Sequence, residues 1–257
     1  MRIAVVTGAS SGMGREFVLQ LGHFYKNLDE IWVIARRKER LVELAKKSRV
    51  PLRIFDGDLQ KKKVYRKLSE AFDRERPDIR MLVNSAGFGK SGTVTEIAEE
   101  SFRSQPDMVD LNCRALTRMT LLCLPRMSRG SRIVNLASAA AFCPQPFFAV
   151  YAATKSYVLS FSRALRAELS ARGILVTAVC PGPVDTEFFD VSGRTDNPWK
   201  KWTMAKASKV VHRALKDSRA GKELSIYGFP MKAAYLGTVL ISNRVIMELM
   251  TAAGGQS

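Results

Sequence analysis

Short, continuously apolar runs recur along the chain and are separated by longer stretches of mixed character. We expect strands at 3–6, 31–35, 52–55, 81–83, 132–136, 174–179 and, less strongly patterned, 224–227. Apolar runs without polar alternation are typical of strands buried on both faces of a parallel sheet. Between these runs, apolar residues three and four apart predict helices, for example from Met13 to about Tyr25. The alternation predicts an α/β fold, a doubly wound sheet of about seven mainly parallel strands with helices on both faces.

No internal repeat and no Gly/Ser-rich linker interrupts this pattern. We therefore expect residues 1–257 to form a single domain. The stretch 231–252 is predicted as one C-terminal helix that is apolar on several faces. Its apolar surplus indicates a subunit contact in a homodimer or homotetramer. A membrane-surface helix, or a wall of a hydrophobic substrate site, is the less favoured alternative.

The composition is that of a folded protein. Hydrophobic residues make up 46% and charged residues 25% of the chain, which excludes extended disorder. The cysteines at 113, 123, 143 and 180 form no CxxC pair, so we expect neither a disulfide framework nor a metal site. Cys113 and Cys180 lie in apolar runs and are interpreted as small core residues. The N-terminus lacks a signal-peptide pattern and the uncharged stretch 233–243 is too short to span a bilayer, so we expect a cytoplasmic protein.

The junction between the first strand and the first helix is rich in glycine. The segment TGASSGMG at 7–14 places glycines at 8, 12 and 14, where they permit a tight turn and a close approach of backbone to a ligand. Free N–H groups and the helix dipole at this point favour a pyrophosphate. We interpret the segment as a dinucleotide site, and the alternative is a glycine-rich turn without a ligand.

Arg36 and Arg37 directly follow the second strand, which in a dinucleotide fold ends beside the adenosine ribose. An acidic residue there would bind a ribose 2′-hydroxyl and repel a 2′-phosphate. Two guanidiniums instead match a phosphate in charge and geometry, which predicts NADP(H) rather than NAD(H). The alternative is a solvated, basic start of a helix.

The formal net charge is +17, and residues 36–80 contain 16 Lys and Arg against 8 Asp and Glu. Such a stretch also occurs in nucleic-acid-binding proteins. Here the basic residues are interspersed with acids and lack an accompanying aromatic stacking pattern. We interpret them as a solvated face that attracts an anionic cofactor and expect no nucleic-acid partner.

Tyr151 and Lys155 form a YxxxK pair, which on a helix shares one face. An ammonium near a phenol lowers the phenol pKa, so we expect Tyr151 to transfer protons at neutral pH. Such a pair also occurs by chance on surface helices.

Taken together, these motifs resemble the short-chain dehydrogenase/reductase family in order and spacing from Thr7 to Thr186. The matching pieces are TGASSGMG at 7–14, Asp58-Leu59, Asn84-Ser-Ala-Gly87, Asn112, Ser138, YAATK at 151–155 and Pro181-Gly182. The resemblance implies a Rossmann-like fold with catalytic residues Asn112, Ser138, Tyr151 and Lys155. Tyr151 would exchange the proton, Ser138 would bind the substrate oxygen, Lys155 would tune Tyr151 and hold the nicotinamide ribose, and Asn112 would anchor a water.

The same resemblance implies a set of cofactor-binding residues. They are Gly8, Ser10, Ser11, Gly12, Met13, Gly14, Arg36, Arg37, Asp58, Leu59, Asn84, Ala86, Gly87, Tyr151, Lys155, Pro181, Gly182, Val184 and Thr186.

Aromatic residues surround the expected substrate position. In the family, the segment 187–204 is a lid, and here it contains Phe188, Phe189, Trp199 and Trp202. A second apolar wall is expected from Phe142, Pro146, Phe147 and Phe148. These aromatics indicate a hydrophobic substrate, although a surface loop packed on the body would have the same composition.

We therefore predict an NADP(H)-dependent oxidoreductase that interconverts a carbonyl and a secondary alcohol by hydride transfer, on a substrate such as a steroid or acyl ketone. The alternative is a non-catalytic NADP-binding sensor or scaffold on the same fold.

Overall fold

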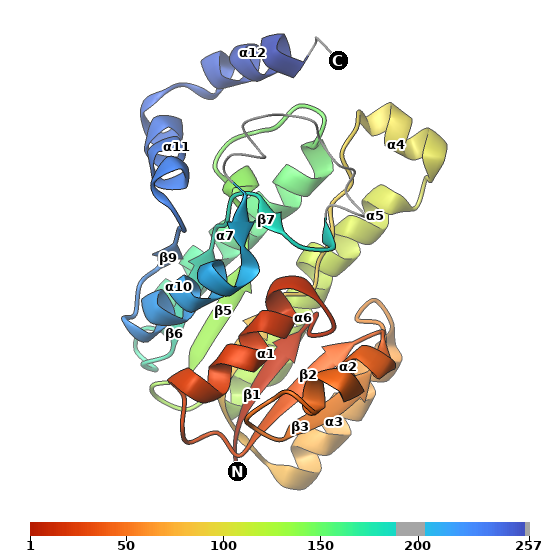
Figure 1. Ribbon diagram of the computed structural model, residues 1–257, viewed down its shortest axis with the longest axis vertical. Coiled ribbons are helices and arrows are strands. Elements are labelled where there is room, and N and C mark those ends of the chain that lie inside the picture. Colours follow the sequence, from red (N-terminus) through yellow and green to blue (C-terminus); the bar gives the residue numbers. More distant parts are fainter. Residues whose placement is uncertain (189–203, 255–257) are drawn as a thin grey trace.

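The computed structural model describes residues 1–188 and 204–254 of the chain. It has the predicted α/β architecture (Figure 1). The main sheet contains β1 (Arg2–Thr7), β2 (Glu30–Ala35), β3 (Leu52–Asp56), β4 (Asp78–Asn84), β5 (Arg132–Leu136), β6 (Leu175–Val179) and β9 (Leu224–Ser225). The strands lie in the order β3-β2-β1-β4-β5-β6-β9, and all pairs are parallel. The seven strands expected from the apolar runs are therefore confirmed, although β9 is shorter than predicted.

Helices cover both faces of the sheet, which explains why its strands lack polar alternation. The helices are α1 (Gly12–Phe24), α2 (Lys38–Ala45), α3 (Lys62–Glu75), α4 (Val94–Glu100), α5 (Ser104–Val109), α6 (Leu116–Cys123), α7 (Ala149–Leu169) and α10 (Ala207–Arg219). Phe17 of α1, Leu41 of α2 and Val211 of α10 are fully buried in the core on one face. Leu68 of α3 and Met119 of α6 are fully buried in the core on the other face.

The strand order reverses between β1 and β4. The chain moves outward from β1 to β2 and β3, and then returns to the opposite side of β1 to build β4, β5 and β6. In open sheets of this kind, ligands bind outside the carboxyl ends of the strands at this switch point. The loops after β1, β2, β4 and β5 therefore meet at one edge.

A small second sheet pairs β7 (Val184–Asp185) with β8 (Ala205–Lys206). The sequence pattern did not predict it, because two-residue strands are too short to show periodicity. The two strands flank the segment 189–203, so the predicted lid residues Phe189, Trp199 and Trp202 lie outside the described part of the chain.

The prediction of one continuous helix over 231–252 is wrong. The structure has α11 (Phe229–Leu240) and α12 (Asn243–Gly254), separated at Ile241 by an extended conformation with φ −106° and ψ 137°. The break precedes Ser242 and Asn243, residue types that favour helix starts over helix interiors. α12 crosses the end of the molecule above α11 (Figure 1). Within the described residues, none of the helices combines the length and apolarity needed to cross a membrane.

Candidate active site

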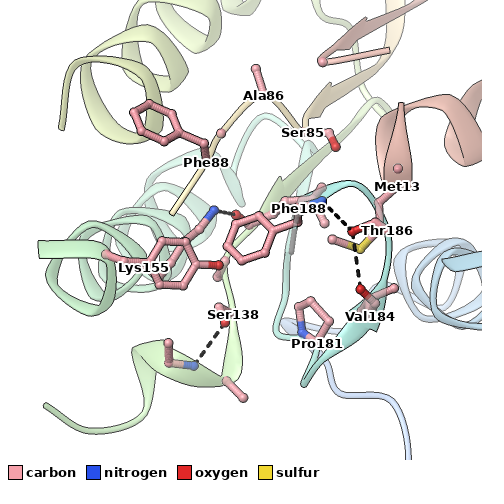
Figure 2. A pocket seen from close by; sticks show the side chains of 18 of the residues that line it. Met13, Ser85, Ala86, Phe88, Ser138, Lys155, Pro181, Val184, Thr186 and Phe188 are labelled. Atoms are coloured by element: carbon pink, nitrogen blue, oxygen red, sulfur yellow. Dashed lines mark hydrogen bonds between the residues drawn. The ribbon is translucent and has the colours of Figure 1, made fainter. Parts of the chain in front are cut away.

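A cavity of about 1060 Å³ lies at the carboxyl edge of the sheet. Every residue predicted as catalytic or cofactor-binding lines this cavity except Asn84 and Asn112. The loops after β1, β2 and β4 line one end, and Ser138, Tyr151 and Lys155 line the other. Figure 2 shows Ser138 and Lys155 on one side and Met13 and Ser85 on the other. Met231 of α11 and Met250 of α12 contribute to the far wall.

The glycine-rich loop is built around contacts that exclude a side chain. A Cβ atom on Gly8, where φ is +68°, would lie 2.8 Å from Ala86 Cα, and one on Gly14 would lie 2.3 Å from the Gly8 carbonyl oxygen. The loop therefore packs directly against the β4 end and against the start of α1. Ser11, the N-cap of α1, makes no side-chain capping bond, and the first turn contains no acidic residue. The α1 N-terminus is thus suited to an anionic group.

Arg37 faces this loop from the end of β2. Its guanidinium donates hydrogen bonds to Ser11 Oγ at 2.8 Å and to Ser10 Oγ at 3.3 Å. It also pairs with the Glu187 carboxylate at 2.9 Å. Arg36 lines the cavity as well. Both predicted arginines are therefore beside the adenosine end of the expected cofactor site.

Ser138, Tyr151 and Lys155 are brought together by the end of β5 and the first turns of α7. The Ser138 side chain hydrogen-bonds the Tyr151 side chain, and Ser138 Oγ also accepts from Ala140 N at 3.1 Å. Lys155 is 7% exposed, and its Nζ donates to the Leu136 carbonyl at 2.8 Å. Nζ lies 5.6 Å from the centroid of the Tyr151 ring. The Ser138 hydroxyl and the Lys155 ammonium therefore lie on one side of the cavity (Figure 2), and Tyr151 lines the cavity with them.

The expected lowering of the Tyr151 pKa is not found in the structure. Burial raises the pKa of Tyr151 to about 12, and the hydrogen bond with Ser138 lowers it by less. The Phe148 and Phe188 rings contact Tyr151 at centroid distances of 4.3 and 5.4 Å. Lys155 does not offset this apolar cover, because burial lowers the pKa of its own ammonium to about 8 and Lys155 is therefore uncharged at the pH where Tyr151 ionises.

The Asn84 side chain points into the core, and its predicted contact with the cofactor stays a prediction. Its amide nitrogen donates to Thr120 Oγ1 at 3.1 Å and to Asn135 Oδ1 at 2.9 Å, inside the core beside the sheet. The side chain therefore braces β4 against β5 and α6 and does not line the large cavity. The following residues Ala86 and Gly87 do line it.

Asn112 is likewise buried and does not line the cavity. It lies in a π-helical stretch, η1 (Asp110–Ala115), between α5 and α6. Its amide exchanges two hydrogen bonds with the Phe88 backbone, at 3.0 and 2.9 Å, and donates to Thr154 Oγ1 at 3.0 Å. In this structure Asn112 ties the loop after β4 to α7, and its implied role in holding a water stays a prediction.

The structure also changes the interpretation of several single residues. Phe142 and Phe148 form part of the predicted second wall, whereas Pro146 and Phe147 do not line the cavity. Phe147 has a φ of +59° and is exposed, so the chain turns outward there. Cys180 is buried as predicted, but Cys113 is only half-buried.

Some lining residues on both sides of the cavity were not predicted from the sequence. Gln60, Asp107 and Leu111 lie at the cofactor end, and Cys143, Gln145, Met231, Ile241 and Ile246 at the substrate end. The Gln60 amide donates to the Asp107 carbonyl at 2.9 Å, which joins segments 47 residues apart. A local sequence pattern contains no signal for such a contact.

Among residues 1–188 and 204–254, no cluster of His, Cys, Asp and Glu could hold a metal ion.

The comparison with known proteins agrees with this geometry. A family model described as short chain dehydrogenase matches residues 2–197. The chain belongs to the short-chain dehydrogenase family. This membership makes it an oxidoreductase-family protein and confirms the fold that the motifs implied.

Among the relatives of this short-chain dehydrogenase, an uncharacterized oxidoreductase of Staphylococcus epidermidis is 32% identical over 187 residues, covering 72% of this chain and 79% of that protein. The 17-beta-hydroxysteroid dehydrogenase type 3 of Danio rerio is 32% identical over 191 residues, covering 71% of this chain and 61% of that protein. A solved short-chain dehydrogenase from Sphingobium yanoikuyae in complex with NADPH is 26% identical, with a TM-score of 0.78, and the match covers 93% of this chain and 94% of that one.

Proposed function

We propose that this short-chain dehydrogenase is an NADP(H)-dependent enzyme that interconverts a carbonyl and a secondary alcohol on a hydrophobic substrate such as a steroid or an acyl ketone. The observation that carries the proposal is the joint placement of Ser138, Tyr151 and Lys155 in one cavity with the glycine-rich loop. A scaffold that only bound nucleotide would not need a serine hydroxyl, a buried tyrosine hydroxyl and a buried ammonium on the substrate side.

The side chains suggest how the proton is handled. A substrate oxygen between Ser138 and Tyr151 would accept a hydrogen bond from each hydroxyl. Tyr151 holds its proton at neutral pH, as any tyrosine does, and burial raises its pKa further, so it is in the form that can donate that proton to a carbonyl oxygen as the oxygen becomes an alcohol. In the oxidative direction Tyr151 would take the proton back. The nicotinamide cofactor supplies or accepts the hydride.

The cofactor preference rests on the donors around Arg37. Ser10, Ser11 and Arg37 form a polar corner at the end of β2, and the Glu187 carboxylate lies against Arg37. Because the corner already holds the Glu187 carboxylate, it has an affinity for anions. Binding of a ribose 2′-phosphate would require the same affinity. The NADPH complex of the Sphingobium relative supports the same preference.

The substrate class rests on the apolar end of the cavity. Its lining includes Phe142, Cys143, Phe148, Phe188, Met231, Ile241, Ile246 and Met250. Burying a ligand among such side chains contributes roughly 25 cal/mol per Å² of apolar surface, so a large apolar skeleton is favoured over a small polar ketone. The hydroxysteroid dehydrogenase of Danio rerio supports this class.

A paired substitution tests the catalytic assignment. Tyr151→Phe removes one hydroxyl and little volume, so turnover should fall by about 10²–10⁴ while NADPH binding survives. The assay follows nicotinamide absorbance with a panel of steroid and acyl ketones and the matching alcohols, with both NADPH and NADH. Tyr157→Phe is the control, because Tyr157 lies on the same helix but is exposed and hydrogen-bonds Thr117 at 2.7 Å.

Normal turnover of Tyr151→Phe on a substrate that the wild type converts would remove Tyr151 from the mechanism. Tight NADPH binding with no turnover of any carbonyl or alcohol by the wild type would instead favour the sensor or scaffold function.

A further inference from the structure

Glu187 is held by two arginines at the edge of the cofactor end of the cavity. Arg37 Nη1 lies 2.9 Å from Glu187 Oε2, and Arg40 Nη1 contacts the other carboxylate oxygen, Oε1. The pairing lowers the pKa of Glu187, chiefly through the hydrogen bond from Arg37. Arg40 lies in the first turn of α2 and was not among the residues predicted from the motifs.

The Glu187 carboxylate reaches this position from a segment 150 residues further along the chain than Arg37. Glu187 follows β7, and Thr186 lies against the glycine-rich loop, since a Cβ atom on Gly12 would be 3.5 Å from the Thr186 side chain. The same Arg37 guanidinium donates to both Ser10 and Ser11. The carboxylate therefore shares Arg37 with the corner that the proposed function assigns to the ribose 2′-phosphate.

The two ion pairs are replaceable. The side chains of Arg37, Arg40 and Glu187 are 43%, 46% and 46% exposed. Ion pairs that are this exposed are weak, because water and salt screen them and two long side chains must be held in one geometry. A phosphate monoester carries about −1.5 to −2 charges at pH 7 and three acceptor oxygens, so it competes well against one carboxylate for the same guanidiniums.

We propose that Glu187 is an internal competitor for the 2′-phosphate subsite, and that Arg40 is a further residue of this subsite. The proposal rests on the NADP(H) preference proposed above. In the structure the carboxylate neutralises Arg37 and Arg40, and a 2′-phosphate takes its place. Glu187 therefore weakens binding of 2′-phosphorylated ligands, whereas a ligand with a free 2′-hydroxyl does not need to displace it.

Binding of two adenosine nucleotides, measured by calorimetry on the full chain, tests this proposal. Adenosine 2′,5′-bisphosphate carries the 2′-phosphate, and 5′-AMP lacks it. Glu187→Gln should bind the bisphosphate about three- to tenfold more tightly than the wild type, with 5′-AMP binding unchanged. Arg40→Gln should weaken the bisphosphate about tenfold and again leave 5′-AMP unchanged, because a charge-assisted hydrogen bond is lost.

Glu43→Gln is the matched control. Like Glu187→Gln, this variant removes one negative charge, but the charge lies on α2. The Glu43 carboxylate pairs with Lys46 at 2.6 Å and not with Arg37 or Arg40. This variant should bind both nucleotides as the wild type does, and retained 5′-AMP binding reports that each variant is folded.

The outcomes separate the two proposals. A wild type that prefers the bisphosphate, together with a Glu187→Gln variant that binds it no more tightly, overturns the role of Glu187 alone. A wild type that binds both nucleotides equally overturns the NADP(H) preference and, with it, the subsite. A gain for both nucleotides in Glu187→Gln also overturns the proposal, because it would show a general charge effect.

Discussion

Lys155 is a buried ammonium with a single described hydrogen bond, to the Leu136 carbonyl. Burial lowers its pKa from 10.5 to about 8, and its charge is favoured only weakly by the Cys113 and Cys180 thiols. Below pH 8 the protein therefore holds a charge in an apolar place, which costs stability. Between pH 8 and 10.5 the unfolded chain binds more protons at this position than the folded chain, so the contribution of Lys155 to stability becomes less unfavourable as pH rises.

Lys155→Met should reveal this cost. The free energy of unfolding of the wild type should rise by about 2–3 kcal/mol between pH 8 and 10.5, compared with that of Lys155→Met. The reason is that a difference of one in a pKa between the folded and the unfolded chain corresponds to about 1.36 kcal/mol. Chemical denaturation at several pH values measures it. Lys209→Met, at an exposed position of α10, is the control and should keep the pH dependence of the wild type. A difference between wild type and Lys155→Met that is independent of pH would contradict the burial argument.

At the scale of elements, the turn between β1 and α1 sets the position of the whole cofactor end. α1 starts within van der Waals distance of the loop that precedes it, since Gly14 faces the Gly8 carbonyl. On its far side α1 packs on α10, where the Phe24 ring meets His212 at a centroid distance of 5.2 Å. Because it is packed on both sides, α1 has little room to move away from the loop.

Gly14→Ala should therefore lower the free energy of unfolding by about 2–3 kcal/mol and abolish tight NADPH binding, because the new Cβ would displace α1. Gly237→Ala is the matched change. It lies inside α11 with no atom within 4 Å of a new Cβ, and alanine is favoured over glycine in helices by up to about 1 kcal/mol. Thermal unfolding of both variants distinguishes them, and an equal effect at the two positions would refute the packing argument.

At the scale of the molecule, exposed apolar side chains gather in two places, among others, within the part of the chain that the structure describes. One includes Leu121 of α6 and Tyr157 of α7, which are 63% and 41% exposed. The other lies on α11 and α12, where Leu236, Leu240 and Leu249 are 57%, 75% and 64% exposed. Patches of this kind mark interaction surfaces. The second surface lies on the same helices whose other residues line the substrate end of the cavity.

We predict a dimer or tetramer with two-fold symmetry, in which these helices are covered. Light scattering of the wild type at micromolar concentration should show the assembly, and Leu121→Glu or Leu240→Glu should reduce its mass. Val42→Glu on α2 is the control, since Val42 is also exposed at 41% but lies on neither surface. A wild-type monomer would contradict the prediction, and solubility that depends on detergent would instead favour a membrane contact of α11 and α12.

The order of residues along the chain was sufficient to predict the sheet and to name many of the residues that line the cavity. Runs such as 31–35 are apolar throughout because a strand covered on both faces has no solvent side, and this property is visible without coordinates. The glycines at 8 and 14, the YxxxK pair and Ser138 could be predicted because they follow strands in a recurring order, and because a short, fixed spacing sets local geometry.

Which side chains face the cavity, and which charges compete there, depends on long-range packing. Asn84 and Ala86 are two residues apart, yet the first turns into the core and the second lines the cavity. Contacts between distant segments also decide three further features of the structure. They are the break at Ile241, the pairing of β7 with β8, and the ion pair between Glu187 and Arg37, which are 150 residues apart.

The pKa of Tyr151 likewise depends on burial, to which the ring of Phe188, 37 residues further along the chain, contributes as well as that of the nearby Phe148, so the Lys155 spacing alone predicted the direction of the pKa shift wrongly. Local spacing determines which groups are neighbours along a helix, whereas burial and charge at a site arise from every segment that the fold brings to it.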